Sequence, residues 1–170
     1  ILGIAPKYTG PVLYLDWEWD AEEHAQRLRA LCQGAGIDVP RGSIFYRRQA
    51  PSLRESASAI REVISNEGIV LCITDSLGFA RGGEPESAES TLKTFIASRT
   101  LEVPNLVIDH IPKDAKDKRY SFGSVYTRNS VRTSWRIDAS KALGSSDETA
   151  LGFTQAKENM GWEKPRGFTM

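Results

Sequence analysis

The sequence predicts an α/β fold of three layers, in which helices flank a mainly parallel sheet. Strand-like apolar runs alternate with helical periodicity through the first two thirds of the 170 residues, the order that right-handed strand–helix–strand units produce. One run, residues 68–74, is unbroken and ends at Asp75, which is typical of a central strand covered on both faces. The last third has strands without intervening helices, which indicates antiparallel strands at a C-terminal edge.

Composition limits the class of protein. Lys and Arg together number 22, as do Asp and Glu, so no global charge indicates a nucleic-acid or membrane partner. Apolar segments are too short to cross a membrane and no signal-peptide pattern occurs, so we expect a soluble protein with no membrane contact. Cys32 and Cys72 fall in apolar segments, which indicates reduced core thiols and a cytoplasmic location. No linker divides the chain, so we expect one domain over residues 1–170.

The first half of the chain predicts two strand–helix pairs. Residues 11–16 form the first strand, and Asp20 is a suitable N-cap for the helix after it. Residues 43–46 form a short strand, and Ser52 with Glu55 makes a capping box at the start of the next helix. Each helix carries an apolar stripe at helical spacing: Ala21, Ala25, Leu28 and Cys32 in the first, and Leu53, Ala57, Ile60 and Ile64 in the second.

The second half begins with the strand that ends at Asp75 and continues through a glycine loop at residues 81–83. A third helix follows, and residues 105–109 predict a fourth strand that ends at His110. We expect Leu92, Phe95, Ile96 and Arg99 to carry the third helix. The remaining elements are a short helix and three strands, at residues 122–129, 131–138, 149–157 and 168–170.

Polar side chains follow the predicted strands. Glu18, Asp75 and His110 each come after a strand, and Arg132 lies in a later segment. Because the carboxyl ends of parallel strands share one edge of a sheet, we expect such residues to converge. A carboxylate at that edge suits Mg²⁺ beside a nucleotide phosphate. The simpler alternative is that Asp75 only caps the following turn.

Four segments of the chain resemble the RecA-like ATPase core, most closely the RepA-type hexameric replicative helicases and related phage and plasmid AAA-family ATPases. The segments, in order, are residues 12–18 (VLYLDWE), 71–76 (LCITDS), 106–113 (LVIDHIPK), and 122–124 with 129–135 (FGS and NSVRTSW). The resemblance implies ATP and Mg²⁺ as cofactors, a homo-oligomeric ring that is typically a hexamer, and action on single-stranded DNA.

The resemblance also implies a role for each matching residue. Glu18 is similar to the family's catalytic glutamate, which orients and polarises the attacking water. Asp75 resembles the Walker B aspartate that serves the metal, and Ser76 beside it helps to shape the nucleotide site. His110 resembles the sensor of the γ-phosphate. The alternatives are a helix-start acid at Glu18 and a structural histidine at His110, while His24 is interpreted as a surface residue.

Cationic residues complete the implied site. Arg132 resembles the arginine finger that one subunit offers to its neighbour's nucleotide, with Arg128 and Arg136 as competitors. The loop after His110 is implied to face single-stranded DNA, and Arg81 is a weaker candidate for the same contact. The loop's basic residues are Lys113, Lys116, Lys118 and Arg119.

One departure from the family is large: no G-x-x-x-x-G-K-[ST] occurs in the 170 residues. We therefore expect the phosphate-binding loop to lie upstream of residue 1, so that residues 1–170 are a core fragment lacking the P-loop strand and helix and are inactive alone. Two alternatives remain open. One is a non-catalytic RecA-like module for assembly or DNA binding. The other is a serine hydrolase with Ser76 as nucleophile and His110 as base.

Overall fold

The computed structural model describes residues 8–84, 87–110, 125–141, 149–159 and 167–169. Contacts divide the chain into two compact units, residues 1–110 and 111–170, each with its own sheet. The single domain expected over residues 1–170 stays a prediction. Within the described part of the chain, no helix is long and apolar enough to span a bilayer.

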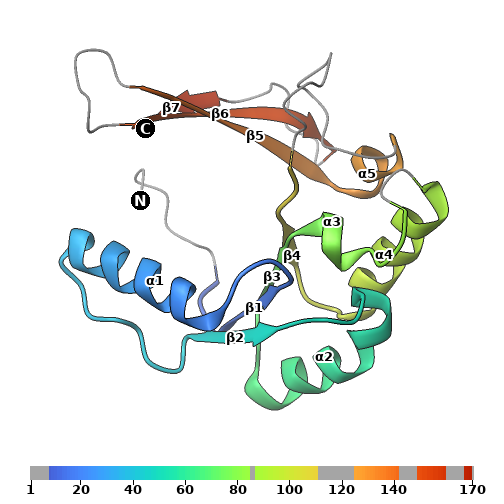
Figure 1. The fold of residues 1–170 in the computed structure, drawn as a ribbon, viewed down its shortest axis with the longest axis horizontal. Helices are drawn as coiled ribbons and strands as arrows, with labels where there is room; N and C mark the ends of the chain where they lie inside the picture. Colours follow the sequence, from blue (N-terminus) through green and yellow to red (C-terminus); the bar gives the residue numbers. More distant parts are fainter. Residues whose placement is uncertain (1–7, 85–86, 111–124, 142–148, 160–166, 170) are drawn as a thin grey trace. The chain divides into compact units, whose positions relative to one another are not determined.

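The first unit contains a four-stranded parallel sheet in the order β2-β1-β3-β4 (Figure 1). Its strands are β1 (Val12–Asp16), β2 (Ile44–Arg48), β3 (Leu71–Asp75) and β4 (Asn105–Val107). Its helices are α1 (Ala21–Ala35), α2 (Leu53–Glu67), α3 (Leu77–Ala80) and α4 (Ala88–Thr100). The parallel sheet with flanking helices confirms the predicted α/β class. The register aligns Asp16 with Asp75, so two carboxylates end neighbouring strands.

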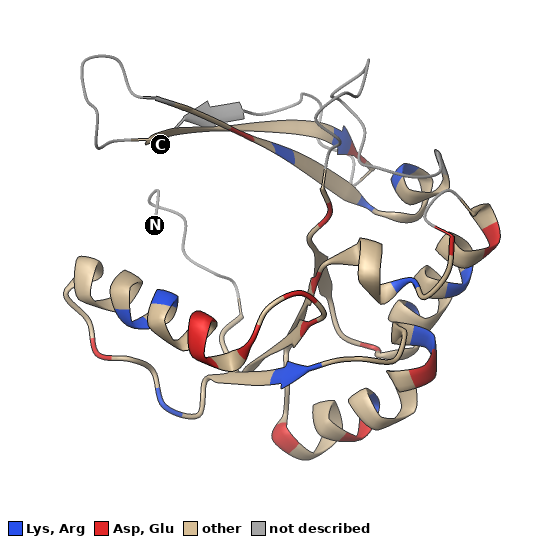
Figure 2. Ribbon diagram, in the orientation of Figure 1, with Lys and Arg blue, Asp and Glu red and all other residues tan. Residues whose placement is uncertain are grey.

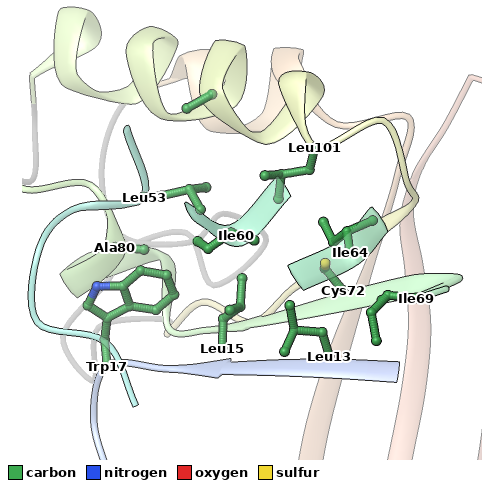
Figure 3. Packing of buried hydrophobic residues seen from close by; sticks show 11 residues of the cluster. Leu13, Leu15, Trp17, Leu53, Ile60, Ile64, Ile69, Cys72, Ala80 and Leu101 are labelled. Atoms are coloured by element: carbon green, nitrogen blue, oxygen red, sulfur yellow. The ribbon is translucent and has the colours of Figure 1, made fainter. Parts of the chain in front are cut away.

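The hydrophobic core lies on one face of this sheet (Figure 3). Leu13 and Leu15 of β1 belong to a buried cluster with Cys72 of β3 and with Ile60 and Ile64 of α2. Side chains two residues apart share a face of a strand. The side chains of β3 alternate between buried and half-buried along the strand, so its second face is covered less deeply than the first.

Both predicted helix starts are confirmed. The Asp20 side chain accepts a hydrogen bond from the Glu23 amide at 3.0 Å, and Ser52 with Glu55 forms a complete capping box. Such caps satisfy amides that have no partner inside the helix. Figure 2 shows acidic and basic residues interspersed along α1 and α2, and these include the Arg27–Glu23 ion pair of α1.

Both cysteines are buried and free, as expected for reduced core thiols. Burial raises the pKa of the Cys72 thiol to about 11. The thiolate is the reactive form of cysteine, so a raised pKa makes Cys72 a poor nucleophile.

The segment after β3 differs from expectation in two ways. Helix α3 was not predicted, because four residues are too few to show a helical period. The buried face of α4 consists of Thr91, Thr94, Phe95 and Ala97, whereas Leu92 and Ile96 are 41% and 58% exposed. A threonine tolerates burial in a helix when its hydroxyl finds an acceptor, as Thr94 does at the Ser90 carbonyl 2.9 Å away.

The loop between α3 and α4 approaches the start of α2 closely. Gly82 has φ +58°, and a Cβ at this position would lie 2.5 Å from the Ser52 Cβ. Only glycine meets both conditions, because other residues rarely adopt this φ and any side chain would displace the cap of α2.

The second unit contains α5 (Val125–Ser130) and an antiparallel sheet of β5 (Thr133–Lys141), β6 (Thr149–Glu158) and β7 (Gly167–Thr169). The predicted antiparallel strands are therefore present. In the described pairings they form a sheet of their own rather than an edge of the parallel sheet.

Candidate functional site

Residues from the ends of three strands meet at one edge of the parallel sheet. The Ser76 hydroxyl, directly after β3, donates a hydrogen bond to Oε1 of Glu18, which lies in the turn after β1. The His110 Nε2 atom, beyond β4, lies 3.1 Å from the same oxygen. The structure thus brings together three of the residues singled out from the sequence, at distances that permit chemistry between them.

Backbone hydrogen bonds fix this convergence. The Trp17 amide donates to the Asp75 carbonyl at 2.7 Å, which ties the turn after β1 to the end of β3. The Leu77 amide donates to the Ile108 carbonyl at 2.8 Å, and the Ile108 amide donates to Thr74 at 2.9 Å. Ser76 is 1% exposed, and as the N-cap of α3 it uses its hydroxyl for Glu18 instead of for the helix.

Asp75 is half-buried, and its Oδ2 atom accepts a hydrogen bond of 2.5 Å from the Tyr14 hydroxyl. Burial and the neighbouring carboxylate of Asp75 both raise the pKa of Tyr14, so this hydroxyl stays protonated and remains a donor. The carboxylate is therefore held in place from one side by a residue of β1. The residue at the N-cap position of α3 is Ser76 rather than Asp75.

The donor set at this edge fits Mg²⁺ bound beside a nucleotide. In the described residues no group of three acidic, histidine or cysteine side chains could enclose a metal. Mg²⁺ at nucleotide sites keeps several waters and takes one or two protein carboxylates together with the phosphates. Asp75 offers such a carboxylate at a strand end, and Ser76, the residue after it, bonds to Glu18.

Asp16 is the acidic residue that sequence reasoning missed. Its side chain is 0% exposed, and Oδ1 accepts hydrogen bonds from the Glu18 and Trp19 amides at 2.8 and 3.0 Å. Oδ2 accepts from the Tyr46 hydroxyl at 2.7 Å. Burial alone would raise the pKa of the Asp16 carboxyl, but its backbone and Tyr46 hydrogen bonds hold that pKa below the ordinary value.

His24 is not a surface residue, contrary to expectation. Its Nε2 atom lies 3.2 Å from Oδ2 of Asp16, and its side chain is 18% exposed. The imidazole lies beside two stacked tyrosine rings, with centroids 4.7 Å from Tyr14 and 5.5 Å from Tyr46. Burial and the Asp16 carboxylate raise the pKa of Tyr46 to about 12, so this phenol also remains a donor. A signal was present in the sequence: Asp16 and Glu18 stand two residues apart at a strand end.

Arg81 was a candidate for DNA contact, and that interpretation is wrong. The residue is 3% exposed, and its guanidinium lies 3.3 Å from Oδ2 of Asp109. A buried arginine paired with a half-buried carboxylate is not available to a polymer in solution. The pair instead anchors the residue before His110, whose own side chain is 68% exposed.

The second unit holds the arginine candidates. Arg132 is exposed and makes no ion pair in the described part of the chain, while Arg136 is paired with Asp138 at 2.7 Å. The Lys157 ammonium donates to the carbonyls of Arg128 and Val131 at 2.6 and 2.7 Å. Burial and the neighbouring arginines lower the pKa of Lys157. The residues Lys113, Lys116, Lys118 and Arg119 lie outside the described residues.

The geometry does not match the serine hydrolase alternative. Ser76 and His110 both contact Oε1 of Glu18, so the carboxylate lies between the hydroxyl and the imidazole. In a Ser–His–acid triad the imidazole lies in the middle and takes the proton from the serine.

Comparisons with known proteins place the fold. No protein-family model matches the chain, and no curated protein does. The chain is similar to the crystal structure of a KaiC-like protein from the hyperthermophilic archaeon Pyrococcus horikoshii OT3. The TM-score is 0.63 at 11% sequence identity, and the match covers 94% of this chain and 70% of the other. The chain has a RecA-like fold. At this identity the similarity shows the fold alone.

Proposed function

We propose that this chain carries the hydrolytic core of a RecA-like ATPase that uses ATP with Mg²⁺. The observation that carries the proposal is the meeting of Glu18, Ser76 and His110 beside Asp75 at the carboxyl edge of the parallel sheet. Ligands of open α/β sheets bind at this edge. The RecA-like fold supports the proposal because it presents the expected strand ends in the expected order.

Glu18 is the proposed general base. Its Oε1 atom accepts from Ser76 and lies against His110, and Oε2 makes no hydrogen bond to the described residues. Oε2 is therefore the oxygen that orients a water and accepts its proton. A positioned general base contributes about 10²–10⁴-fold in rate. The side chain is 17% exposed, which lets water reach the carboxylate.

Asp75 is the proposed metal-serving carboxylate. Bound Mg²⁺ neutralises charge on the phosphates, and this chain's part is to hold an ionised carboxylate in a fixed orientation. Tyr14 does this by donating to Oδ2 of Asp75. His110, with its exposed imidazole, is the proposed sensor that links a phosphate to the Glu18 carboxylate through Nε2.

The finer proposal is a replicative helicase or related DNA motor that acts as a homo-oligomeric ring, typically a hexamer, on single-stranded DNA. The resemblance of the four sequence segments supports it. Arg132 is the proposed finger toward a neighbouring subunit, and its exposed, unpaired state in the described residues suits that role better than the ion-paired Arg136.

The test of the hydrolytic core compares two variants in the intact protein. Glu18→Gln should lower ATP turnover by about 10²-fold or more while nucleotide affinity changes little, because it removes the base. Asp75→Asn should weaken Mg²⁺-dependent nucleotide binding as well. Glu22→Gln, an exposed acid of α1, is the control. Equal loss of nucleotide affinity in both site variants would contradict the separate roles.

Subunit mixing tests the finger. If Arg132 acts across an interface, Arg132→Ala subunits mixed with Asp75→Asn subunits should recover part of the turnover, because a mixed interface holds one intact metal site and one intact arginine. An arginine finger is worth about 10³-fold or more, so even partial recovery is measurable. No recovery would redirect the search to Arg128 or Arg136.

A non-catalytic RecA-like module for assembly or DNA binding is the second candidate, because the 170 residues contain no phosphate-loop motif. Calorimetry with ATP and Mg²⁺ on the intact protein distinguishes the two. Absence of binding would favour the module.

A further inference from the structure

Asp16 is the fully buried carboxylate of the parallel sheet's ligand edge, and its contacts concentrate on one short turn. Asp16 accepts hydrogen bonds from the Glu18 and Trp19 amides, and both amides belong to the turn after β1. The Arg48 guanidinium donates to the carbonyl of Trp19 and lies 3.7 Å from Oδ2 of Asp16. The turn is thus held at its amides and at a carbonyl.

Residues from two other elements hold Asp16 itself. Tyr46 of β2 donates its hydroxyl to Oδ2, and His24 of α1 lies 3.2 Å from the same oxygen. The register places Tyr46 opposite Tyr14 and Arg48 opposite Asp16, so the sheet itself aligns these partners. A side chain held by the turn after β1, by β2 and by α1 has little freedom to move, and the turn that it holds inherits this restriction.

For the stability of the fold, an acid is a costly choice at this position. Taking a carboxylate out of water costs several kcal/mol before its hydrogen bonds compensate, and replacing buried polar networks by apolar side chains is often neutral or stabilising. The opposite face of the same strand, with Leu13 and Leu15, shows the apolar solution. Unlike an apolar residue, the acid fixes the orientation of the Glu18 and Trp19 amides.

We propose that Asp16, held by Tyr46 and His24, is a positioning residue that sets the Glu18 carboxylate against Ser76 and His110. The proposal deepens the proposed function and rests on it where turnover is concerned. The carboxylate of Asp16 takes no part in the reaction. It fixes the backbone from which the general base extends, so its loss lets Glu18 leave the position in which Oε1 meets both partners.

The experiment uses Asp16→Asn and the milder Tyr46→Phe in the intact protein, with Asp20→Asn as matched control. Asp20 lies in the same segment, is exposed, and caps α1, a role that asparagine fills equally well. We expect turnover to fall about 10-fold or more in Asp16→Asn and less in Tyr46→Phe, with ATP affinity within about twofold of the unmodified protein. Asp20→Asn should change neither quantity.

A double-variant cycle separates positioning from a general structural role. If Asp16 acts through Glu18, adding Asp16→Asn to Glu18→Gln should lower turnover no further, because the group being positioned is already gone. A merely structural role would lower turnover by the same factor in both backgrounds. That additive result would overturn the proposal.

A measurement without nucleotide tests the positioning role of Asp16 separately from the proposed function. The ring ¹⁵N signals of His110 should shift in Asp16→Asn and stay in place in Asp20→Asn, because the imidazole contacts the carboxylate that moves. If Glu18→Gln leaves turnover intact but the His110 signals respond to Asp16→Asn, the proposed function fails and the positioning stands. If Glu18→Gln abolishes turnover and Asp16→Asn changes neither turnover nor these signals, the positioning is refuted.

Discussion

The two faces of strand β1 contact different parts of the molecule. Leu13 and Leu15 pack against helix α2 and the segment after α4, and they make no polar contribution. Tyr14 and Asp16 face the other way, where their polar atoms form hydrogen bonds of 2.5 to 3.0 Å with Asp75, Tyr46 and the turn after β1. Because strand side chains alternate, five residues supply both a core and the support of a site. Substitutions on the apolar face should therefore cost the most stability, and those on the polar face should also change the site.

Helices α1 and α2 show the same division. Each has 15 residues, but α2 buries four of them while α1 buries only Cys32. Helix α2 packs with α4 on the apolar face, whereas α1 reaches the strands of the polar face through His24. Both helices carry an apolar stripe in the sequence. Only α2 buries its stripe in the core.

The largest expected effect is on the core face. Leu15→Ala should lower the free energy of unfolding by about 2–5 kcal/mol, because Leu15 is 0% exposed and the substitution leaves a cavity. Chemical denaturation measures the change. Ile73→Ala is the control on the other face of the neighbouring strand, where the side chain is half-buried, and it should cost less than half as much. Equal costs would mean that the two faces are packed alike.

Tyr14→Phe tests the polar face. The substitution keeps the ring and removes the donor to Asp75, so it should lower the free energy of unfolding by about 1.5–3 kcal/mol, as for a hydrogen bond to a charged group. The same substitution in an Asp75→Asn background should cost less, since the charged acceptor is gone. Identical costs in both backgrounds would show that the hydroxyl contributes through another contact.

Thr91→Val should stabilise the protein. The Thr91 hydroxyl is buried and has no hydrogen-bond partner in the described residues, and valine has the same shape without the unsatisfied polar group. The expected gain in unfolding free energy is about 1 kcal/mol, measured by denaturation. Thr94→Val is the matched control on the same helix, and it should destabilise because the Thr94 hydroxyl bonds to Ser90. A loss in both variants would contradict this account of α4.

The smallest effect is confined to acid. The folded-state pKa of Asp16 lies below the unfolded value, which is about 3.9 for aspartate. Its contribution to stability is therefore fully present above about pH 4 and is lost as the pH falls through the folded-state pKa. Unfolding free energies measured across this range should fall more steeply for the unmodified protein than for Asp16→Asn. Parallel curves would indicate that other carboxyl groups dominate.

Periodic and capping signals predicted the strand–helix alternation, the α2 capping box and the strand ends of Glu18, Asp75 and His110, because these depend on local sequence. The support of the site was not predictable in this way. Asp16, Tyr46 and His24 come together only through the register of β1 against β2 and the position of α1 on the sheet. Register is a non-local property, and a single sequence does not state it.

The burial of Arg81 and the exposure of Leu92 and Ile96 in α4 share a similar cause. Hydrophobicity alone favours the opposite arrangement for all three residues. Burial of Arg81 is tolerated because another element supplies a partner, the Asp109 carboxylate. Tertiary packing decides which group lies beside a side chain. Residue type alone therefore mispredicts burial at these positions.

The close approach of Gly82 to Ser52 limits how the chain can vary. Thirty residues separate the two positions in sequence, yet a side chain at 82 would occupy the space of the residue that begins α2. A library that randomises the loop after α3 would lose almost every member altered at 82, while Gly83, whose nearest neighbour is the movable Ser90 hydroxyl 3.3 Å away, is limited mainly by its φ of +143°. Engineering of this loop is best begun beyond the glycine pair, or paired with a redesign of the α2 start.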